Sequence, residues 1–222
     1  MRITDADIDL VTDAVTAAEA RSDAEIATIV AERSDNYNDV PLIWAALTAL
    51  LALAVYAAFP DFYLALLDRI SGGWHVWTMR EWMTVLVFAT TLKFLGALYI
   101  VRWWPLRMIF TPGKTKTRRV RNRAIALFKA STERRTRSRT GVLIYLSLVE
   151  HRAEIVADEA IVARVSPDRW GAAMALLIAE LKQERPGAGM AAAVGAIGDV
   201  LAEHFPRTGT DPDEMPNRMI CL

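Results

Sequence analysis

The chain has 222 residues, 53% of them hydrophobic, and its 26 basic and 26 acidic side chains give a formal net charge of zero. This length leaves room for one domain of average size and a two-helix membrane element. A single cysteine, Cys221, excludes an internal disulfide, and the acidic N-terminal segment is not the pattern of a secretory signal peptide.

Residues 1–40 are predicted to form the first part of a soluble α/β domain. A capping-box pattern at residues 4–7 precedes apolar residues at helical spacing, which predicts an amphipathic helix over residues 5–20. The sequence EIATIVAER at residues 25–33 is rich in β-branched residues and predicts a strand. The polar residues 34–39 then predict a turn.

Two long apolar stretches interrupt this domain. They lie at about residues 41–60 and 82–104, and a helix needs about 20 mainly apolar residues to cross a hydrocarbon layer of roughly 30 Å. The sequence therefore predicts a transmembrane hairpin over residues 41–104. Its connecting segment, residues 61–81, is expected on the outer side of the membrane.

One charged side chain, Lys93, lies inside the second apolar stretch. A charge at the bilayer centre costs about 2.5–3.5 kcal/mol on insertion scales, and the first stretch contains no acidic residue that could neutralise it. Either the ammonium group snorkels to an interface, or it contacts another membrane protein or a second copy of this chain. Ala54 and Ala58 offer a small face for such close helix approach.

The charges that flank the hairpin predict its orientation. Residues 1–40 are mainly acidic and residues 105–140 are strongly basic. The excess of Lys and Arg beside the second span places both soluble segments, and with them both chain termini, in the cytoplasm. Beside a membrane, such a basic run favours anionic lipid over nucleic acid as its partner. The residues predicted to contact lipid are Arg107, Lys114, Lys116, Arg118 and Arg119.

Residues 105–206 are predicted to form the second part of the soluble domain. It begins with a helix over about residues 115–137. The apolar stripe of this helix consists of Val120, Ala124, Leu127 and Phe128. Residues 141–149 are almost continuously apolar, as in a central strand that is covered on both faces. After a short turn at residues 150–152, residues 153–157 are predicted to return as the partner strand of a hairpin.

Two further helices complete this second part. Ser166 and Pro167 form a strong start signal, with serine as the N-cap and proline in the first turn. The buried face of this helix is predicted to consist of Trp170, Met174, Leu177, Ile178 and Leu181. The next helix is expected from Met190 onward. Residues 207–222 contain a glycine and two prolines and are predicted to be a flexible tail.

The two soluble parts are predicted to complete one sheet. A single N-terminal strand cannot make a stable sheet, and the apolar strand at residues 141–149 lacks a partner at one edge. With both parts in the cytoplasm, residues 25–33 can pair with this strand. The fold class is therefore predicted as α/β, a small sheet flanked by helices and interrupted by an inserted two-helix transmembrane hairpin.

Joined across the hairpin, the sequences AEIATIVAERSD and TGVLIYLSLVEHRAEIVAD, followed by SPDRW, resemble the TPM domain family. They are most similar to its bacterial membrane-protein branch with a split domain, and the resemblance covers most of residues 5–205. It implies a helix-flanked sheet in a bacterial inner-membrane protein, with roles in membrane-complex assembly or repair, divalent metal binding or acid phosphatase activity. The chain departs from the family in its cytoplasmic orientation and at Asp158-Glu159-Ala160, where family members often carry glycine.

Oxygen-bearing side chains follow each predicted strand. Asp35 and Asp39 follow the first strand, Glu150 follows the second, and Asp158 ends the third. Ligands bind at strand ends in many α/β domains, and carboxylates suit Ca²⁺ or Mg²⁺. These four residues are the candidate metal ligands, and the alternative is that they form turns and stay solvated. His151 is interpreted as a turn residue rather than a catalytic base.

The sequence carries no catalytic signature. Gly113-Lys114-Thr115 lacks the preceding strand and first glycine of a P-loop, and Gly187-Ala188-Gly189 lacks the strand that precedes a dinucleotide-binding turn. The leading hypothesis is a non-enzymatic membrane protein whose cytoplasmic domain binds a partner or helps a membrane complex to assemble. The alternative is a metal-dependent phosphomonoesterase, in which a bound ion activates water.

Overall fold

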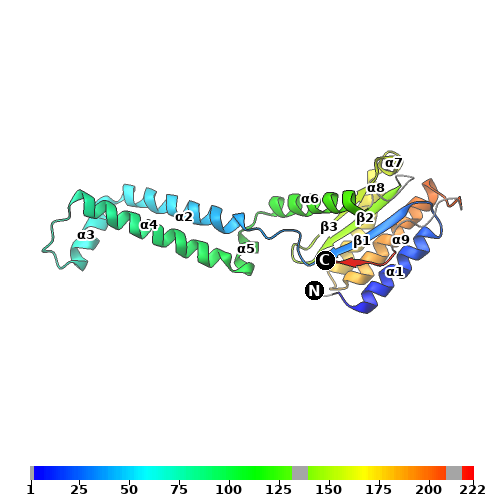
Figure 1. The fold of residues 1–222 in the computed structure, drawn as a ribbon, viewed down its shortest axis with the longest axis horizontal. Helices are drawn as coiled ribbons and strands as arrows, with labels where there is room; N and C mark the ends of the chain where they lie inside the picture. The colour runs from blue at the N-terminus through cyan, green and yellow to red at the C-terminus, as the bar shows by residue number, and fades with distance from the viewer. Residues whose placement is uncertain (1–2, 132–139, 209–216) are drawn as a thin grey trace. The chain divides into compact units, whose positions relative to one another are not determined.

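The chain divides into two compact units, which can be followed in Figure 1. The computed structural model describes residues 3–131, 140–208 and 217–222. Met1–Asp35 and Gly113–Leu222 together form one unit, termed the sheet unit, and Asn36–Pro112 forms the other, termed the hairpin unit.

The sheet unit contains a four-stranded mixed sheet with flanking helices. In chain order its elements are α1 (Asp5–Glu19), β1 (Glu25–Ala31), α6 (Gly113–Ser131), β2 (Gly141–Ser147), β3 (Arg152–Ala157), α7 (Glu159–Val162), α8 (Pro167–Leu181), α9 (Pro186–His204) and β4 (Ile220–Cys221). The strand order is β3-β2-β1-β4, with β1 parallel to β2 and β4, and β3 antiparallel to β2. The predicted α/β class with helices around a small sheet is confirmed.

The central strands β1 and β2 come from opposite sides of the hairpin in the sequence. Val30 is paired with Leu146, and Ile29 with Tyr145. Every residue of both strands is buried, as expected where helices cover both faces of a sheet. The predicted joining of the two soluble parts in one sheet is confirmed. Because both parts belong to one unit, they lie on one side of any bilayer that the hairpin crosses.

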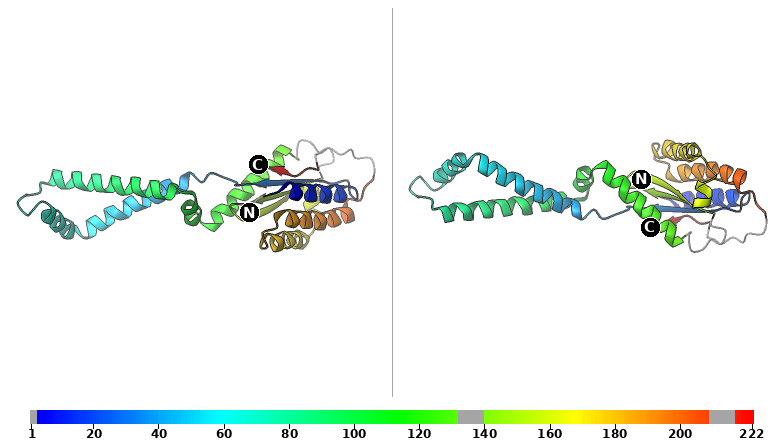
Figure 2. Two further views of the ribbon diagram at one scale, coloured as in Figure 1. Left: turned by 90° about the horizontal axis from the view of Figure 1, so that it is seen from below. Right: turned by 90° about the horizontal axis from the view of Figure 1, so that it is seen from above.

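Two hydrophobic cores cover the two faces of the sheet, which Figure 2 shows nearly edge-on. On one face, alternate residues of β1 and β2 pack against α1, α8 and α9. On the other face, Ile29, Leu143 and Tyr145 pack against α6. Three predicted stripe residues of α6, Val120, Ala124 and Phe128, are buried there, and Leu127 packs beside them. The period-two alternation of the strands thus feeds two separate cores.

The tail contributes a strand that the sequence analysis did not expect. Ile220 and Cys221 form β4 and pair with Ile29 and Val30 at the edge of the sheet. Residues 209–216 of the expected tail lie outside the described residues. A strand of two residues carries no local pattern, so only its pairing with β1 reveals it.

Helices α1 and α9 pack closely at a glycine. A Cβ atom added at Gly198 would lie 2.6 Å from the Cβ atom of Ala18, which is closer than two methyl groups can approach. A Cβ atom added at Gly195, on the same helix, would meet no atom within 4 Å. The two glycines therefore differ in packing while sharing one secondary structure.

We expect Gly198→Ala to destabilise the sheet unit by about 1–3 kcal/mol, because the added methyl group overpacks the contact with Ala18. Gly195→Ala is the matched control, and it should be neutral or stabilising by up to about 1 kcal/mol because alanine favours the helix. Thermal unfolding of the full chain in detergent measures both. Equal shifts in the two variants would contradict the close approach of α1 and α9.

The hairpin unit consists of α2 (Asp39–Ala58), α3 (Pro60–Ile70), α4 (Met79–Arg102) and α5 (Trp104–Phe110). Within the described residues, α2 and α4 are the two helices long and apolar enough to cross a membrane. They pack against each other, yet only 6% of the most apolar part of α4 is buried. Protein therefore leaves most of the apolar surface of α4 uncovered.

Two short helices of this unit were not predicted. The sequence analysis treated residues 61–81 as a connection and began the second soluble part at residue 105. In the structure, Pro60 begins α3 and Pro105 lies in the first turn of α5. Proline ends a preceding helix but suits the first turn of the next, so both prolines mark helix starts as well as breaks.

Candidate functional site

A buried hydrogen-bond network lies at the carboxyl ends of β1 and β2. The Glu150 carboxylate accepts a hydrogen bond from the Ser34 backbone N–H at 2.9 Å and another from the Ser147 hydroxyl. The hydroxyl oxygens of Ser34 and Tyr145 are 2.9 Å apart. Glu150 is only 5% exposed, and Ser147 is fully buried. These bonds tie the segment that leaves β1 to the turn that follows β2.

Burial sets the ionisation of the groups around this network. Burial is the main cause that raises the pKa of the Tyr145 hydroxyl, and the Glu150 charge raises it further, while the hydrogen bond with Ser34 lowers it. Glu154 is paired with Tyr145 across β2 and β3. Burial also raises the pKa of Glu154, and Arg121, 3.9 Å away, lowers it. Tyr145 therefore keeps its proton at neutral pH and serves as a hydrogen-bonding group rather than as a nucleophile.

A cleft of about 430 Å³ opens beside this network. Its lining consists of Leu146, Ser147, Leu148, His151, Ile178, Leu181, Lys182 and Glu184. Four of these eight side chains are leucine or isoleucine and four are polar or charged, and the exposed surface of the cleft is mainly apolar. That composition and volume match those of sites that bind small ligands or peptide side chains. Ser147 belongs to both features, because it lines the cleft and its hydroxyl donates to the Glu150 carboxylate.

Two residues of the cleft adopt left-handed backbone conformations. The φ angles are 48° at His151 and 58° at Glu184, a region that few residues other than glycine enter. His151 lies in the turn between β2 and β3, as predicted. Glu184 follows α8, where the Arg185 N–H donates to the Glu180 carbonyl at 3.1 Å and ends the helix. Such conformations cost free energy and gather at functional sites, so their meeting in one cleft supports a binding role.

The four predicted metal ligands do not meet at one place. Glu150 belongs to the network above, whereas the Asp158 carboxylate accepts from the Gly141 N–H at 2.8 Å at the start of β2. Seven residues of β2 separate these two positions by about 20 Å. Asp35 pairs with an arginine of α6, and Asp39 lies in the first turn of α2.

Among the described residues, no group of three or more His, Cys, Asp or Glu side chains is arranged to hold a metal ion. Each carboxylate of the sheet unit that the sequence singled out already accepts a hydrogen bond or ion pair from the protein. The predicted residues therefore do not fit a shared Ca²⁺ or Mg²⁺ site.

Arg107, which the sequence placed against lipid, has another role within the hairpin unit. Its guanidinium donates to the carbonyls of Asn36 at 2.8 Å and Arg102 at 2.9 Å, and to Oδ1 of Asn38 at 3.3 Å. The side chain is buried, and its positive charge lies at the C-terminal end of α4, where helix carbonyls favour a cation. Arg107 thus clasps the beginning of the hairpin unit to its end.

The other predicted lipid contacts lie on α6. The Arg119 guanidinium is mostly buried and lies 2.8 Å from the Asp35 carboxylate. Lys114 and Arg118 are exposed, and Lys116 is half-buried. Exposed lysine and arginine side chains can reach anionic headgroups, so lipid contact by these three stays a prediction.

Lys93 is exposed on α4, and the described residues give its ammonium group no ion pair. The buried small residues of α2 are Ala45 and Ala52, whereas Ala54 and Ala58 are exposed. The small face that the sequence analysis singled out therefore remains open. Contact of Lys93 with a second protein stays a prediction.

Sequence reasoning did not identify the cleft, and of its eight lining residues it considered only His151 as a possible site residue. It assigned Ile178 to the buried face of α8, but Ile178 is 43% exposed while its neighbour Leu177 is fully buried. Successive residues of a helix point about 100° apart, so both cannot face the core centre. One sequence signal could have pointed to this end of the cleft. Helix α8 ends shortly before Pro186 without the glycine that commonly follows a helix, so another residue, Glu184, has to adopt the left-handed conformation.

No protein-family model and no curated protein matches the chain. One solved structure is similar, the NMR structure of BA42, a protein from the psychrophilic bacterium Bizionia argentinensis. The match covers 100% of this chain and 97% of BA42, with a TM-score of 0.57 and 17% sequence identity. The fold resembles that of TPM-like proteins. At this identity the likeness shows the TPM-like fold alone.

Proposed function

We propose that this chain is a non-enzymatic protein of the bacterial inner membrane whose cytoplasmic sheet unit binds an apolar segment of a partner protein. The observation that carries the proposal is the apolar cleft between the end of β2 and α8. Ile178, which lines the cleft from α8, is 43% exposed. A partner segment with two or three large apolar side chains suits such a surface.

Membrane anchoring is supported by the uncovered apolar surface of α4 and by the length of both candidate spans. Exposing such a surface to water costs roughly 25 cal/mol of free energy for each Å² of apolar area. A bilayer is therefore the better solvent for this helix. The basic residues on α6 support the cytoplasmic side for the sheet unit. Anchoring would keep the cleft close to partners in the same membrane.

Binding is favoured over catalysis by the state of the polar groups. The hydroxyl of Ser147 is buried, Tyr145 keeps its proton, and Glu150 accepts two hydrogen bonds from the protein. A phosphomonoesterase needs a water or nucleophile activated at an open site. His151 lines the cleft, but among the described residues no hydrogen bond joins its ring to a serine, threonine or cysteine side chain, and no acidic, histidine or cysteine cluster is arranged to hold a metal ion.

Ile178→Glu is expected to reduce partner recovery at least about tenfold, since a buried unpaired carboxylate costs well above 1.4 kcal/mol. The matched control is Leu10→Glu on α1, because Leu10 is 47% exposed and Ile178 is 43% exposed. The measurement is quantitative co-purification from detergent-solubilised membranes, with chemical cross-linking before lysis.

The control should leave recovery unchanged, and circular dichroism should show both variants folded. If both variants retain their partner, the cleft is not the binding surface. If both lose it equally, the loss is not specific to α8, and the proposal is likewise contradicted.

A further inference from the structure

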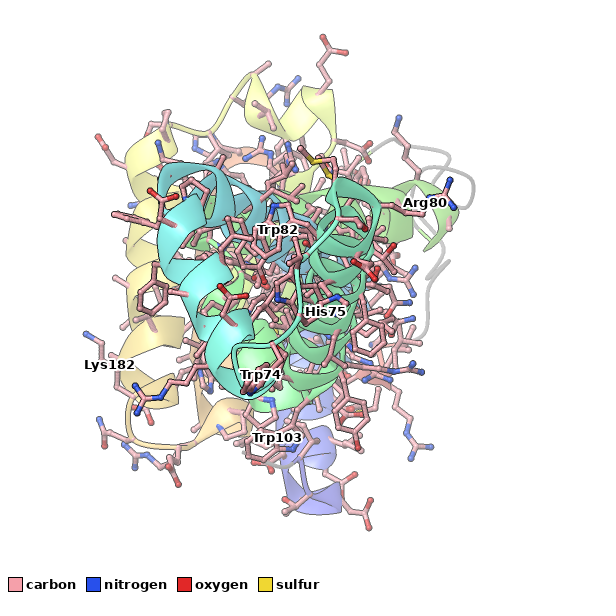
Figure 3. All side chains as sticks on the ribbon, turned by 90° about the vertical axis from the view of Figure 1, so that its left-hand side faces the viewer. Trp74, His75, Arg80, Trp82, Trp103 and Lys182 are labelled. Carbon is pink, nitrogen blue, oxygen red and sulfur yellow. The ribbon has the colours of Figure 1, made fainter. Side chains whose placement is uncertain are left out.

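Helix α3 begins where α2 ends, without a connecting loop. Phe59 is both the C-cap of α2 and the N-cap of α3, and Pro60 is the first residue of α3. The rings of Tyr56 and Tyr63 pack edge-to-face across this break, with centroids 4.8 Å apart. This contact holds the change of direction, and Figure 3, which looks onto this end of the hairpin unit, shows α3 running across the view.

The side chains of α3 divide into two faces. Phe62, Leu66 and Ile70 lie four residues apart and form one exposed apolar ridge. Asp61 and Asp68 lie on the opposite side of the helix and are also exposed. No residue of α3 is buried. The ridge is therefore an apolar surface that the described protein leaves uncovered.

The segment after α3 exposes more apolar surface. Gly72 and Gly73 have φ angles of 80° and 76°, which turn the chain at the end of the helix. Trp74 follows, is 95% exposed, and lies beside the end of α3 in Figure 3. Val76 is also exposed. Tryptophan concentrates at membrane–water interfaces, where its indole ring is half in hydrocarbon and half in water.

The length of α2 decides what covers this surface. Its 20 residues span about 30 Å, the thickness of the hydrocarbon layer, so α3 begins where the hydrocarbon ends. A helix with one apolar and one acidic face at that depth has the pattern of an interfacial helix.

We propose that α3 and Trp74 lie in the headgroup layer of the leaflet at the turn of the hairpin, with phospholipid as their partner. The ridge of Phe62, Leu66 and Ile70 enters the boundary of the acyl chains, and Asp61 faces water. This inference rests on the membrane anchoring proposed above. It makes α3 an anchor in the leaflet opposite to the sheet unit's side, which opposes withdrawal of the two spans.

The test measures depth at two positions of the same helix. In the full chain carrying Cys221→Ser, single cysteines are introduced as Leu66→Cys, Asp68→Cys or Phe88→Cys and spin-labelled. The protein is reconstituted in phosphatidylcholine vesicles. Collision with dissolved oxygen and with a water-soluble nickel chelate is then compared by power-saturation electron paramagnetic resonance.

We expect the ratio of oxygen to nickel accessibility to be several fold higher at Leu66 than at Asp68, and highest at Phe88 on α4. Equal, water-like ratios at Leu66 and Asp68 with a deep Phe88 would overturn the inference alone and assign the ridge to a protein partner. Equally deep ratios at both α3 positions would also overturn it. A water-like ratio at Phe88 would instead overturn the membrane anchoring.

Discussion

Replacing Glu150 with alanine is expected to destabilise the sheet unit by about 3 kcal/mol or more. The change leaves the Ser34 N–H and the Ser147 hydroxyl without their acceptor, and each buried unsatisfied group costs about 1–3 kcal/mol. The measurement is urea or thermal unfolding of the full chain in detergent, followed by the near-ultraviolet signal of the sheet unit.

Glu32→Ala provides the control, because Glu32 is an exposed acid that follows β1 in the same region. Its effect should stay within about 0.5 kcal/mol. Glu150→Gln, which keeps one acceptor oxygen, should fall between the two. A single hydrogen bond contributes roughly 1 kcal/mol net. If Glu150→Ala lowers the free energy of unfolding by less than about 1 kcal/mol, the hydrogen bonds of Glu150 do not hold the end of β1.

Replacing Leu92 with arginine is expected to reduce membrane insertion of the chain about a hundredfold. Leu92 is 61% exposed near the middle of α4, where a second charge beside Lys93 costs about 2.5–3.5 kcal/mol. The measurement is the fraction of newly made protein that stays with membranes after alkaline carbonate extraction.

Met79→Arg is the matched control, because Met79 is 71% exposed but is the first residue of α4. At the interface the cost of a charge falls toward zero, so this variant should insert normally. If α4 were an exposed helix in water, both variants would behave alike. Equal extraction of the two would therefore contradict a membrane-spanning α4.

The central elements of the fold follow from local sequence signals. Three elements were predicted from local signals that each indicate one structure. These signals are the β-branched run in β1, the continuous apolar run in β2 and the capping box of α1. Pairing of β1 with β2 was inferred because neither strand can remain unpaired. For each of these elements one physical requirement, helix capping or the burial and pairing of an apolar strand, allows a single structure.

Helix α9 shows where local signals misled. It was expected from Met190, but it begins at Pro186 and includes Gly187 and Gly189, although glycine has a low helix propensity. A Cβ atom at Gly189 would lie 2.9 Å from the Leu177 carbonyl oxygen, and one at Gly187 would overlap Asp7. These glycines allow close helix packing, which outweighs their low helix propensity.

The cleft could not be derived from the sequence for a similar reason. It arises where the end of α8 meets the turn after β2, and this meeting depends on tertiary packing. The candidate metal ligands were chosen because they follow predicted strands, but a single sequence does not state which strand ends share an edge of the sheet. Glu150 and Asp158 are close in sequence and lie at opposite ends of one strand.

The hydrogen bond between Ser34 and Glu150 joins two parts of the chain that are synthesised at different times. Ser34 and Glu150 are 116 residues apart, so at 5–20 residues per second the ribosome needs roughly 10 s to deliver the second after the first. During that interval α2 and α4 are synthesised, while the apolar strand β1 has no partner strand yet. Synthesis therefore completes the whole hairpin unit before the sheet unit can form its central pair of strands.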